Sequence, residues 1–127
     1  MKWDGVIDNI YFLALVNRRD LQSIRDLNEN HLKLLENILE KSLELIKSKY
    51  GINSNKPKIF FHYQPSFYHL HVHFQHIKFD SGNVTASRAH LLKSEIENIK
   101  LCTSYYQQAS FYLISSIFYF KSIFSEE

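Results

Sequence analysis

The chain has 127 residues, of which 45% are hydrophobic and 22% charged, and these proportions are ordinary for a single soluble globular domain. A formal net charge of +2 is too small for a surface that coats nucleic acid by charge alone, although a local anion site stays open. The single cysteine, Cys102, excludes an internal disulfide and indicates a reducing compartment, cytoplasmic or nuclear. A buried or bystander thiol is favoured over a catalytic one.

A strand is expected first, over residues 10–16, because IYFLALV is an unbroken apolar run of strand length. A long helix is expected over residues 29–49, where apolar side chains recur at spacings of three and four and form one stripe: Leu32, Leu35, Leu39, Leu43 and Ile46. Asn28 is the expected N-cap of this helix, since its side-chain oxygen can accept a free backbone N–H. Gly51 suits the position just past the C-terminus of the helix.

Two strands and a shorter helix are expected in the second half of the chain. The segments KIFFHY, residues 58–63, and FYHLHVHFQHIKF, residues 67–79, have strand character, and the short connector QPS makes them neighbours. Residues 80–88 are rich in turn-forming residues. A helix is predicted over residues 88–100, from four residues at helical spacing: Leu91, Leu92, Glu95 and Ile99.

The C-terminal stretch, residues 105–124, is ambiguous, and we interpret it as a strand near SFYLI followed by a short helix. Its most apolar part is broken by Ser115, Ser116 and Lys121 and is too short and too polar to span a bilayer. No secretory signal is recognised either, so we expect no membrane association. The order strand, helix, strand, strand, helix predicts an α+β domain with an antiparallel sheet.

The segment FYHLHVHFQH, residues 67–76, contains four of the seven histidines. His69, His71 and His73 occupy alternate positions, so on a strand their side chains would share one face. The other face would carry the apolar and aromatic set that packs on the core: Tyr68, Leu70, Val72 and Phe74. His76 lies three residues after His73, so it would face the other way and have a structural role.

A row of imidazoles is compatible with a solvated face without chemistry, a metal site or a binding site for an extended anion. A metal is disfavoured, because two alternate strand positions can share one ion but His69 and His73 would lie about 13 Å apart. The missing ligand would have to come from His62, His76 or Asp80, and neither CxxC nor HExxH is present. A phosphate chain fits the row best, since one neutral imidazole can attack phosphorus while its neighbours hold the oxygens.

The segment HLHVHF resembles the histidine-triad (HIT) motif, in which histidine alternates with hydrophobic residues. The segments HYQPSFYHLHVHF, SRAHLLKSEIENI and YYQQ, together with residues 2–39, are similar to the C-terminal domain of the scavenger mRNA decapping enzymes. The resemblance covers nearly the whole chain. It implies one HIT-type catalytic domain over residues 1–127, with an antiparallel sheet, a long helix and a second shorter helix. It also implies a homodimer and no cofactor.

The resemblance implies hydrolysis of the 7-methylguanosine cap on a dinucleotide or a short capped RNA left by mRNA decay, with release of 7-methyl-GMP. His71 would be the nucleophile that forms a covalent nucleotidyl-histidine, His73 would contact phosphate and His69 would organise the strand. The residues that match substrate-binding positions of the family are Lys2, His62, Ser66 and Tyr68.

The chain departs from the family in two respects. The family has a separate N-terminal domain that provides an aromatic and an acidic residue for the methylated base. This chain, which begins with MKW, does not contain that domain, so either the chain is a shortened form of a longer protein or the cap-specific half is absent. Trp3 is not expected to replace the aromatic residue. Phe67 stands where the family has a tyrosine, so one hydroxyl that can touch phosphate is missing. Two alternatives therefore stay open: a general HIT nucleotide hydrolase that acts on phosphoramidates, and a non-catalytic nucleotide- or cap-binding module.

Other polar residues carry weaker signals. Arg18, Arg19 and Arg25 could form a basic rim for capped RNA or be ordinary surface charges. His31 and His90 lie near predicted helix starts and are expected to have no catalytic part. The YYQQ motif could serve either packing or the site.

Overall fold

The computed structural model describes residues 5–6, 10–79 and 88–111 as an α+β fold with a four-stranded antiparallel sheet. The strands are β1 (Tyr11–Leu15), β2 (Pro57–His62), β3 (His71–His76) and β4 (Ala89–Leu91), and they lie in the order β1-β3-β2-β4. β3 is therefore a central strand, paired with β1 along one side and with β2 along the other. The predicted fold class is confirmed.

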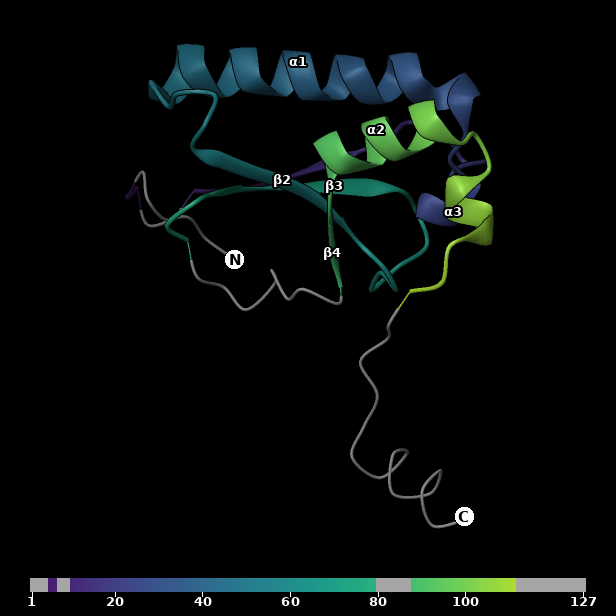
Figure 1. Ribbon diagram of the computed structural model, residues 1–127. Coiled ribbons are helices and arrows are strands. Elements are labelled where there is room, and N and C mark those ends of the chain that lie inside the picture. Colours follow the sequence, from purple (N-terminus) through teal and green to yellow (C-terminus); the bar gives the residue numbers. More distant parts are fainter. Residues whose placement is uncertain (1–4, 7–9, 80–87, 112–127) are drawn as a thin grey trace, which may run out of the picture.

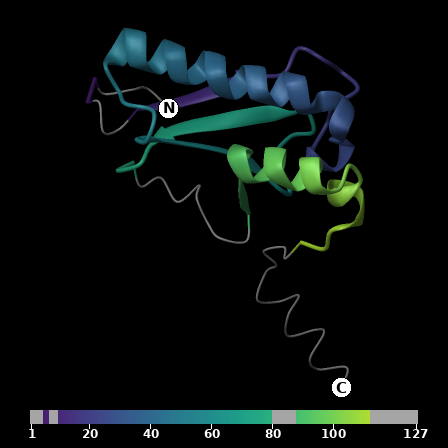
Figure 2. The same ribbon diagram turned by 45° about the horizontal axis from the view of Figure 1, so that its top comes forward.

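Helices cover one face of this sheet (Figure 1). α1 (Leu32–Tyr50) runs across the sheet and α2 (Leu92–Leu101) lies on the same side, as the turned view of Figure 2 also shows. α3 (Tyr105–Gln108) is a short helix that follows α2, and two 3-10 helices, η2 (Ile24–Asp26) and η3 (Glu29–His31), connect β1 to α1. None of the helices within the described ranges is long and apolar enough to cross a membrane.

Alternation along β3 sends its two sets of side chains to opposite faces of the sheet. Val72 and Phe74 are buried on the helix side, in one cluster with Leu35 of α1. His71 and His73 therefore lie on the face that is turned away from the helices. The apolar cluster specifies this register, because a shift of one residue would place the histidines in the core.

The long helix begins three residues later than predicted, at Leu32. The preceding residues form η3, in which the Asn28 side-chain oxygen accepts the N–H of Asn30 at 2.9 Å and His31 Nδ1 accepts the N–H of Asn28 at 3.1 Å. Asn28 is thus a cap as predicted, but the turn that it starts is tighter than an α-helix. The prediction for the C-terminus of this helix is confirmed. Gly51 has a left-handed φ of 68°, and its N–H donates to the carbonyl oxygen of Lys47 in the last turn at 2.8 Å.

β1 and β2 match the predicted strands to within one residue at each end. The strand predicted over residues 67–79 is shorter than expected, because β3 begins only at His71. Residues 66–69 form a bend instead. The carbonyl oxygen of Leu70 accepts the N–H of Val16, and the N–H of Leu70 donates to the carbonyl oxygen of Leu21, at 3.0 Å each. His69 therefore precedes the strand, which corrects the prediction that all three histidines lie on it.

The helix predicted over residues 88–100 begins four residues late, at Leu92. The residues before it form β4, which pairs with β2 from Phe60 to His62. The helical spacing correctly predicts α2. The same spacing continues into the residues before it, but their backbone forms hydrogen bonds with β2.

Several predictions fall outside the described residues. The strand near residues 110–114 and the short helix after it lie mostly within residues 112–127, and most of the turn at 80–88 is likewise not described. Lys2 and Trp3 also lie outside the described residues. Within the C-terminal stretch the structure shows one element, the helix α3.

Candidate active site

Three histidine rings meet on the sheet face that is turned away from α1 and α2. The rings of His71 and His73 have centroids 5.0 Å apart, and the ring of His62 lies 4.1 Å from that of His73. The sheet register explains the meeting, because Phe60 of β2 is paired with His73 and His62 follows two residues later on the same face. The prediction of an open row of imidazoles is wrong in one respect: His71 is only 5% and His73 only 6% exposed.

The geometry around His71 leaves one ring nitrogen available for chemistry. Its Nδ1 lies 2.7 Å from the carbonyl oxygen of His69. A carbonyl oxygen can only accept, so in this contact Nδ1 donates its hydrogen, and in the neutral ring Nε2 keeps a lone pair. The ring of Phe67 stacks on the imidazole, with centroids 4.2 Å apart and planes inclined by 11°. This is the tautomer that a nucleophilic histidine requires.

His69 uses its own ring to connect two segments. Its Nε2 lies 2.6 Å from the carbonyl oxygen of Val16, just past the end of β1. Because that oxygen is an acceptor, Nε2 donates to it and is occupied. The contact fastens the bend before β3 to the strand beside it, so it fits an organising part for His69 rather than a reacting one.

His73 is enclosed by aromatic groups. Its ring stacks on that of Phe60, with centroids 5.1 Å apart and planes inclined by 6°, and its Nδ1 lies 2.7 Å from the hydroxyl of Tyr11. Burial, with smaller contributions from the two neighbouring histidines and Arg88, lowers the pKa of His73 to about 3. The ring is therefore neutral at pH 7, and it can donate a hydrogen bond but adds no charge.

Positive charge beside the histidines comes from Arg88, which the sequence analysis did not single out. Its Nη2 donates to Ser66 Oγ at 3.2 Å and its Nε to the carbonyl oxygen of Gln64 at 3.3 Å. These bonds join the residue before β4 to the bend between β2 and β3. A guanidinium beside a hydroxyl is a suitable pair for phosphate oxygens. The signal that could have found it is an arginine at the end of the turn-rich stretch, within the motif SRAHLL.

Of the predicted substrate-binding residues, His62 and Ser66 lie at this site, whereas Lys2 is outside the described residues. Tyr68 does not join the buried face of Leu70 as predicted. It lies in the bend before β3 and is 52% exposed, whereas Leu70 is 2% exposed.

Arg25 makes contacts within the fold, which favour a structural role over a basic rim for capped RNA. Its Nη1 donates to the carbonyl oxygens of Tyr106 and Ala109, at 3.0 and 2.5 Å. Its guanidinium also lies over the rings of Tyr63 and Phe111, 5.0 and 4.5 Å from their centroids. A side chain with this many partners inside the protein has little left for RNA.

The YYQQ motif has a packing role. Gln107 donates from Nε2 to the carbonyl oxygens of Arg25 and Leu27, at 2.6 and 2.8 Å, and Tyr106 is 1% exposed. The motif thus fastens α3 to η2.

The remaining candidates make the following contacts. Arg18 forms an ion pair with Asp20 at 2.6 Å, and Arg19 is exposed. The ring of His90 packs edge-on against Phe111, with centroids 4.8 Å apart. Cys102 is an exposed free thiol, so the buried interpretation is wrong. Among the described residues, no group of three His, Cys, Asp or Glu side chains could hold a metal ion.

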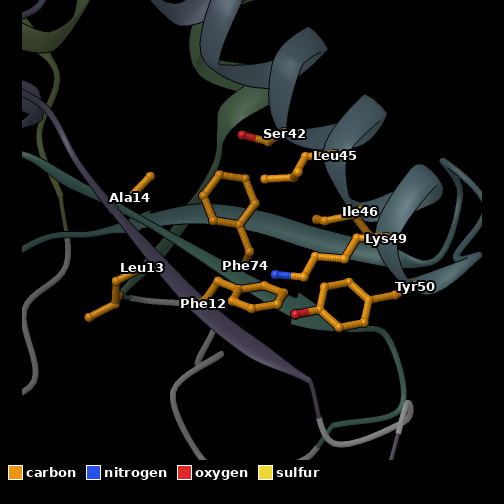
Figure 3. Close-up of a pocket in the computed structure, with 9 residues that line it drawn as sticks. All are labelled: Phe12, Leu13, Ala14, Ser42, Leu45, Ile46, Lys49, Tyr50 and Phe74. Atoms are coloured by element: carbon orange, nitrogen blue, oxygen red, sulfur yellow. The ribbon is translucent and has the colours of Figure 1, made fainter.

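A groove lies between β1 and α1 (Figure 3). It has a volume of about 200 Å³. Figure 3 shows the rings of Phe12 and Phe74 facing Leu45 and Lys49 of α1, while Leu13 points away. Its lining includes no histidine, so we do not assign it to the candidate active site.

Comparison with known proteins shows similarity along most of the chain. A family described as scavenger mRNA decapping enzyme C-term binding matches residues 1–89. An m7GpppX diphosphatase from Caenorhabditis elegans is 45% identical over 111 residues, which are 87% of this chain and 36% of that protein. The m7GpppX diphosphatase of Homo sapiens is 40% identical over 109 residues, which are 85% of this chain and 32% of that protein. The chain thus spans about a third of the length of these relatives.

Proposed function

The chain belongs to the scavenger mRNA decapping enzymes, as the C-terminal part of that family, and on this premise we propose that it hydrolyses the 7-methylguanosine cap left by mRNA decay. The proposed substrate is a capped dinucleotide or a short capped RNA, and the proposed product is 7-methyl-GMP. The name of the relatives, m7GpppX diphosphatase, supports the substrate class.

One observation supports the proposed mechanism most strongly: the hydrogen bond from His71 Nδ1 to the carbonyl oxygen of His69, at 2.7 Å. It leaves the Nε2 lone pair of His71 for attack on the phosphorus that carries 7-methylguanosine. The new N–P bond forms as the bond from that phosphorus to the bridging oxygen breaks, and a nucleoside diphosphate or a diphosphate-ended RNA leaves with the electron pair. Water then attacks the same phosphorus, the N–P bond breaks and 7-methyl-GMP is released.

The groups around His71 support this chemistry on the phosphate side. Arg88 supplies a fixed charge, and Ser66 and His62 supply polar groups beside it. When His71 becomes positively charged in the covalent intermediate, the carbonyl oxygen of His69 stabilises the N–H that faces it. Positioning is the main requirement, because the hydrogen bond of His71 Nδ1 to the carbonyl oxygen of His69 already selects the nitrogen that attacks.

A general nucleotide hydrolase that acts on phosphoramidates is the second candidate. The observation in its favour is that the described groups at the site are all suited to binding phosphate. The small cavity beside His71, lined by Gln22, Ser23, Phe61, His62, Pro65 and Leu70, offers no carboxylate for a methylated base. Comparing rates on methylated and unmethylated cap dinucleotides and on a nucleoside phosphoramidate separates the two candidates.

We further propose that the chain acts as a homodimer in the cytoplasm or nucleus. Leu13 and Leu15 support the dimer, because both lie on β1 at the edge of the sheet and are 47% and 60% exposed. The free thiol of Cys102 supports a reducing compartment. Sedimentation at micromolar concentration tests the dimer, and a monomer throughout would contradict it.

The function is tested by hydrolysis of a capped dinucleotide with the wild-type chain, His71→Asn and His76→Asn. His76 is a matched control, because it lies on β3 with its side chain on the helix side of the sheet. We expect His71→Asn to lose turnover by several orders of magnitude while keeping its thermal melting transition. We expect His76→Asn to keep turnover within a few-fold of the wild type. Near wild-type turnover by folded His71→Asn would contradict the covalent mechanism, and an inactive wild type would contradict the function.

A further inference from the structure

We propose that Tyr11 is a positioning residue that fixes the tautomer of His73, so that His73 presents its Nε2–H to a non-bridging phosphoryl oxygen. The inference rests on the proposed function and assigns a part to a residue of β1 that lies 62 positions away along the chain.

The antiparallel register brings the two side chains together. Leu13 is the partner of His73 in the pairing of β1 with β3, so Tyr11, two residues before Leu13, is the diagonal neighbour of His73 on the same face. The Tyr11 hydroxyl lies 2.7 Å from His73 Nδ1. The ring of Tyr11 also packs on that of Phe79, with centroids 6.0 Å apart, which restricts its movement.

The contact is best described as an O–H that donates to a bare nitrogen. His73 is neutral at pH 7, because its pKa is lowered to about 3, so only one of its ring nitrogens carries hydrogen. Burial raises the pKa of Tyr11, so the phenol keeps its proton. An unprotonated imidazole nitrogen accepts more strongly than a phenol oxygen, whose lone pair is partly delocalised into the ring.

As a consequence, the imidazole of His73 keeps an available hydrogen-bond donor at Nε2. With Nδ1 accepting, the hydrogen of His73 lies on Nε2. That atom is buried and has no hydrogen-bond partner among the described residues. A buried N–H without a partner costs free energy, so its presence beside a reacting group calls for an explanation. A phosphoryl oxygen held next to His71, whose ring lies 5.0 Å away, would be the missing acceptor.

Tyr11 matters because the other two histidines are fixed differently. His69 and His71 each donate to a backbone carbonyl oxygen, which leaves no choice of tautomer. A hydroxyl can donate or accept, so the tautomer of His73 depends on this one side chain. Without the hydroxyl, hydrogen could move to Nδ1, and the bare Nε2 would then face an anionic oxygen, which is repulsive.

The test compares Tyr11→Phe with Tyr105→Phe in the full chain. Both variants lose one phenol hydroxyl, but the ring of Tyr105 packs on Tyr106 in α3, at a centroid distance of 4.9 Å. Long-range ¹H–¹⁵N correlation spectra show which ring nitrogen of His73 carries hydrogen, and the His73→Asn spectrum assigns the signals. Hydrolysis of the capped dinucleotide gives kcat and KM for the same proteins.

We expect Nε2–H in the wild type and in Tyr105→Phe, and a mixture of both tautomers in Tyr11→Phe. We also expect Tyr11→Phe to lower kcat about three- to tenfold with little change in KM, as the loss of one hydrogen bond predicts. An Nδ1–H form in the wild type, or an unchanged tautomer and kcat in Tyr11→Phe, would overturn the inference. If the wild type does not hydrolyse the dinucleotide, the proposed function fails. The tautomer comparison still shows whether Tyr11 determines the tautomer of His73.

Discussion

The ring of Phe67 lies flat on the imidazole of His71, with centroids 4.2 Å apart and planes inclined by 11°. Phe67 is itself 46% exposed, whereas His71 is 5% exposed, so the aromatic ring covers the proposed nucleophile. Stacking limits the rotation of the imidazole and leaves its hydrogen bond to His69 intact. Phe67 therefore provides a second constraint on the direction of the Nε2 lone pair.

Removal of this ring should impair turnover more than folding. We expect Phe67→Ala to lower kcat about tenfold, because a looser imidazole spends less time in line for attack. Phe67→Tyr should keep the stack and stay close to the wild type. Steady-state hydrolysis of the capped dinucleotide is the measurement, with Leu101→Ala, at an 85% exposed position of α2, as the control. Wild-type kcat in Phe67→Ala would show that the stack has no part in positioning.

His69 should tolerate substitution better than His71. His69→Asn loses the donor to the Val16 carbonyl oxygen, so the bend before β3 loosens, but the nucleophile remains. We expect kcat to fall by about one to two orders of magnitude, which is less than for His71→Asn. Parallel kinetics of the two variants check the order, and equal losses would mean that His69 takes part in the chemistry.

Glu95 is a buried carboxylic acid within α2. It is 0% exposed, and neither of its oxygens has a hydrogen-bond partner among the described residues. Burial raises the pKa of Glu95 well above its ordinary value of 4.5. The folded protein keeps a proton that the unfolded chain loses above that ordinary value. The free energy of unfolding should therefore fall as the pH rises from about 4.5 towards the raised pKa.

Glu95→Gln should remove this pH dependence. The slope of the unfolding free energy against pH should become less negative by up to about 1.4 kcal/mol per pH step as the pH rises above about 5. Urea unfolding across that range measures it, and the control is Glu97→Gln, whose side chain is 69% exposed beside Lys100. If the slopes of Glu95→Gln and the wild type were equal, Glu95 would not hold a proton in the folded state.

Arg25 should affect stability and leave substrate affinity unchanged. Arg25→Ala leaves the carbonyl oxygens of Tyr106 and Ala109 without their charged donor, so we expect a loss of about 2–3 kcal/mol in the free energy of unfolding. Arg19→Ala, at an exposed position, should change it by less than about 0.5 kcal/mol. Thermal melting and KM are measured on both. A raised KM with unchanged stability in Arg25→Ala would restore the basic rim.

Local patterns predicted much of this fold. The apolar stripe from Leu32 to Ile46 identified α1, and Gly51 marked its C-terminus because capping depends on the few residues around a helix terminus. Asn28 was correctly identified as a cap, but of the 3-10 helix η3 that precedes α1. Period-two alternation placed His71 and His73 on the face opposite to Val72, for the same local reason.

Contacts between distant segments were not predictable in this way. The sequence pattern predicts a helix over the residues of β4, because only the pairing with β2 shows that they form a strand. Arg88 reaches Ser66 across a separation of 22 positions, and Tyr11 reaches His73 across 62. Such partners are set by the strand order and register of the folded sheet, which a single sequence does not contain.

The covalent intermediate on His71 is tested most directly by trapping it. The full chain is mixed with a capped dinucleotide, denatured at neutral pH during the first turnovers because phosphoramidates hydrolyse in acid, and digested for mass spectrometry. The account predicts a 7-methyl-GMP adduct on the peptide that contains His71, present in His69→Asn and absent in His71→Asn. Turnover with the adduct on another residue, or with an adduct that persists in His71→Asn, would contradict it.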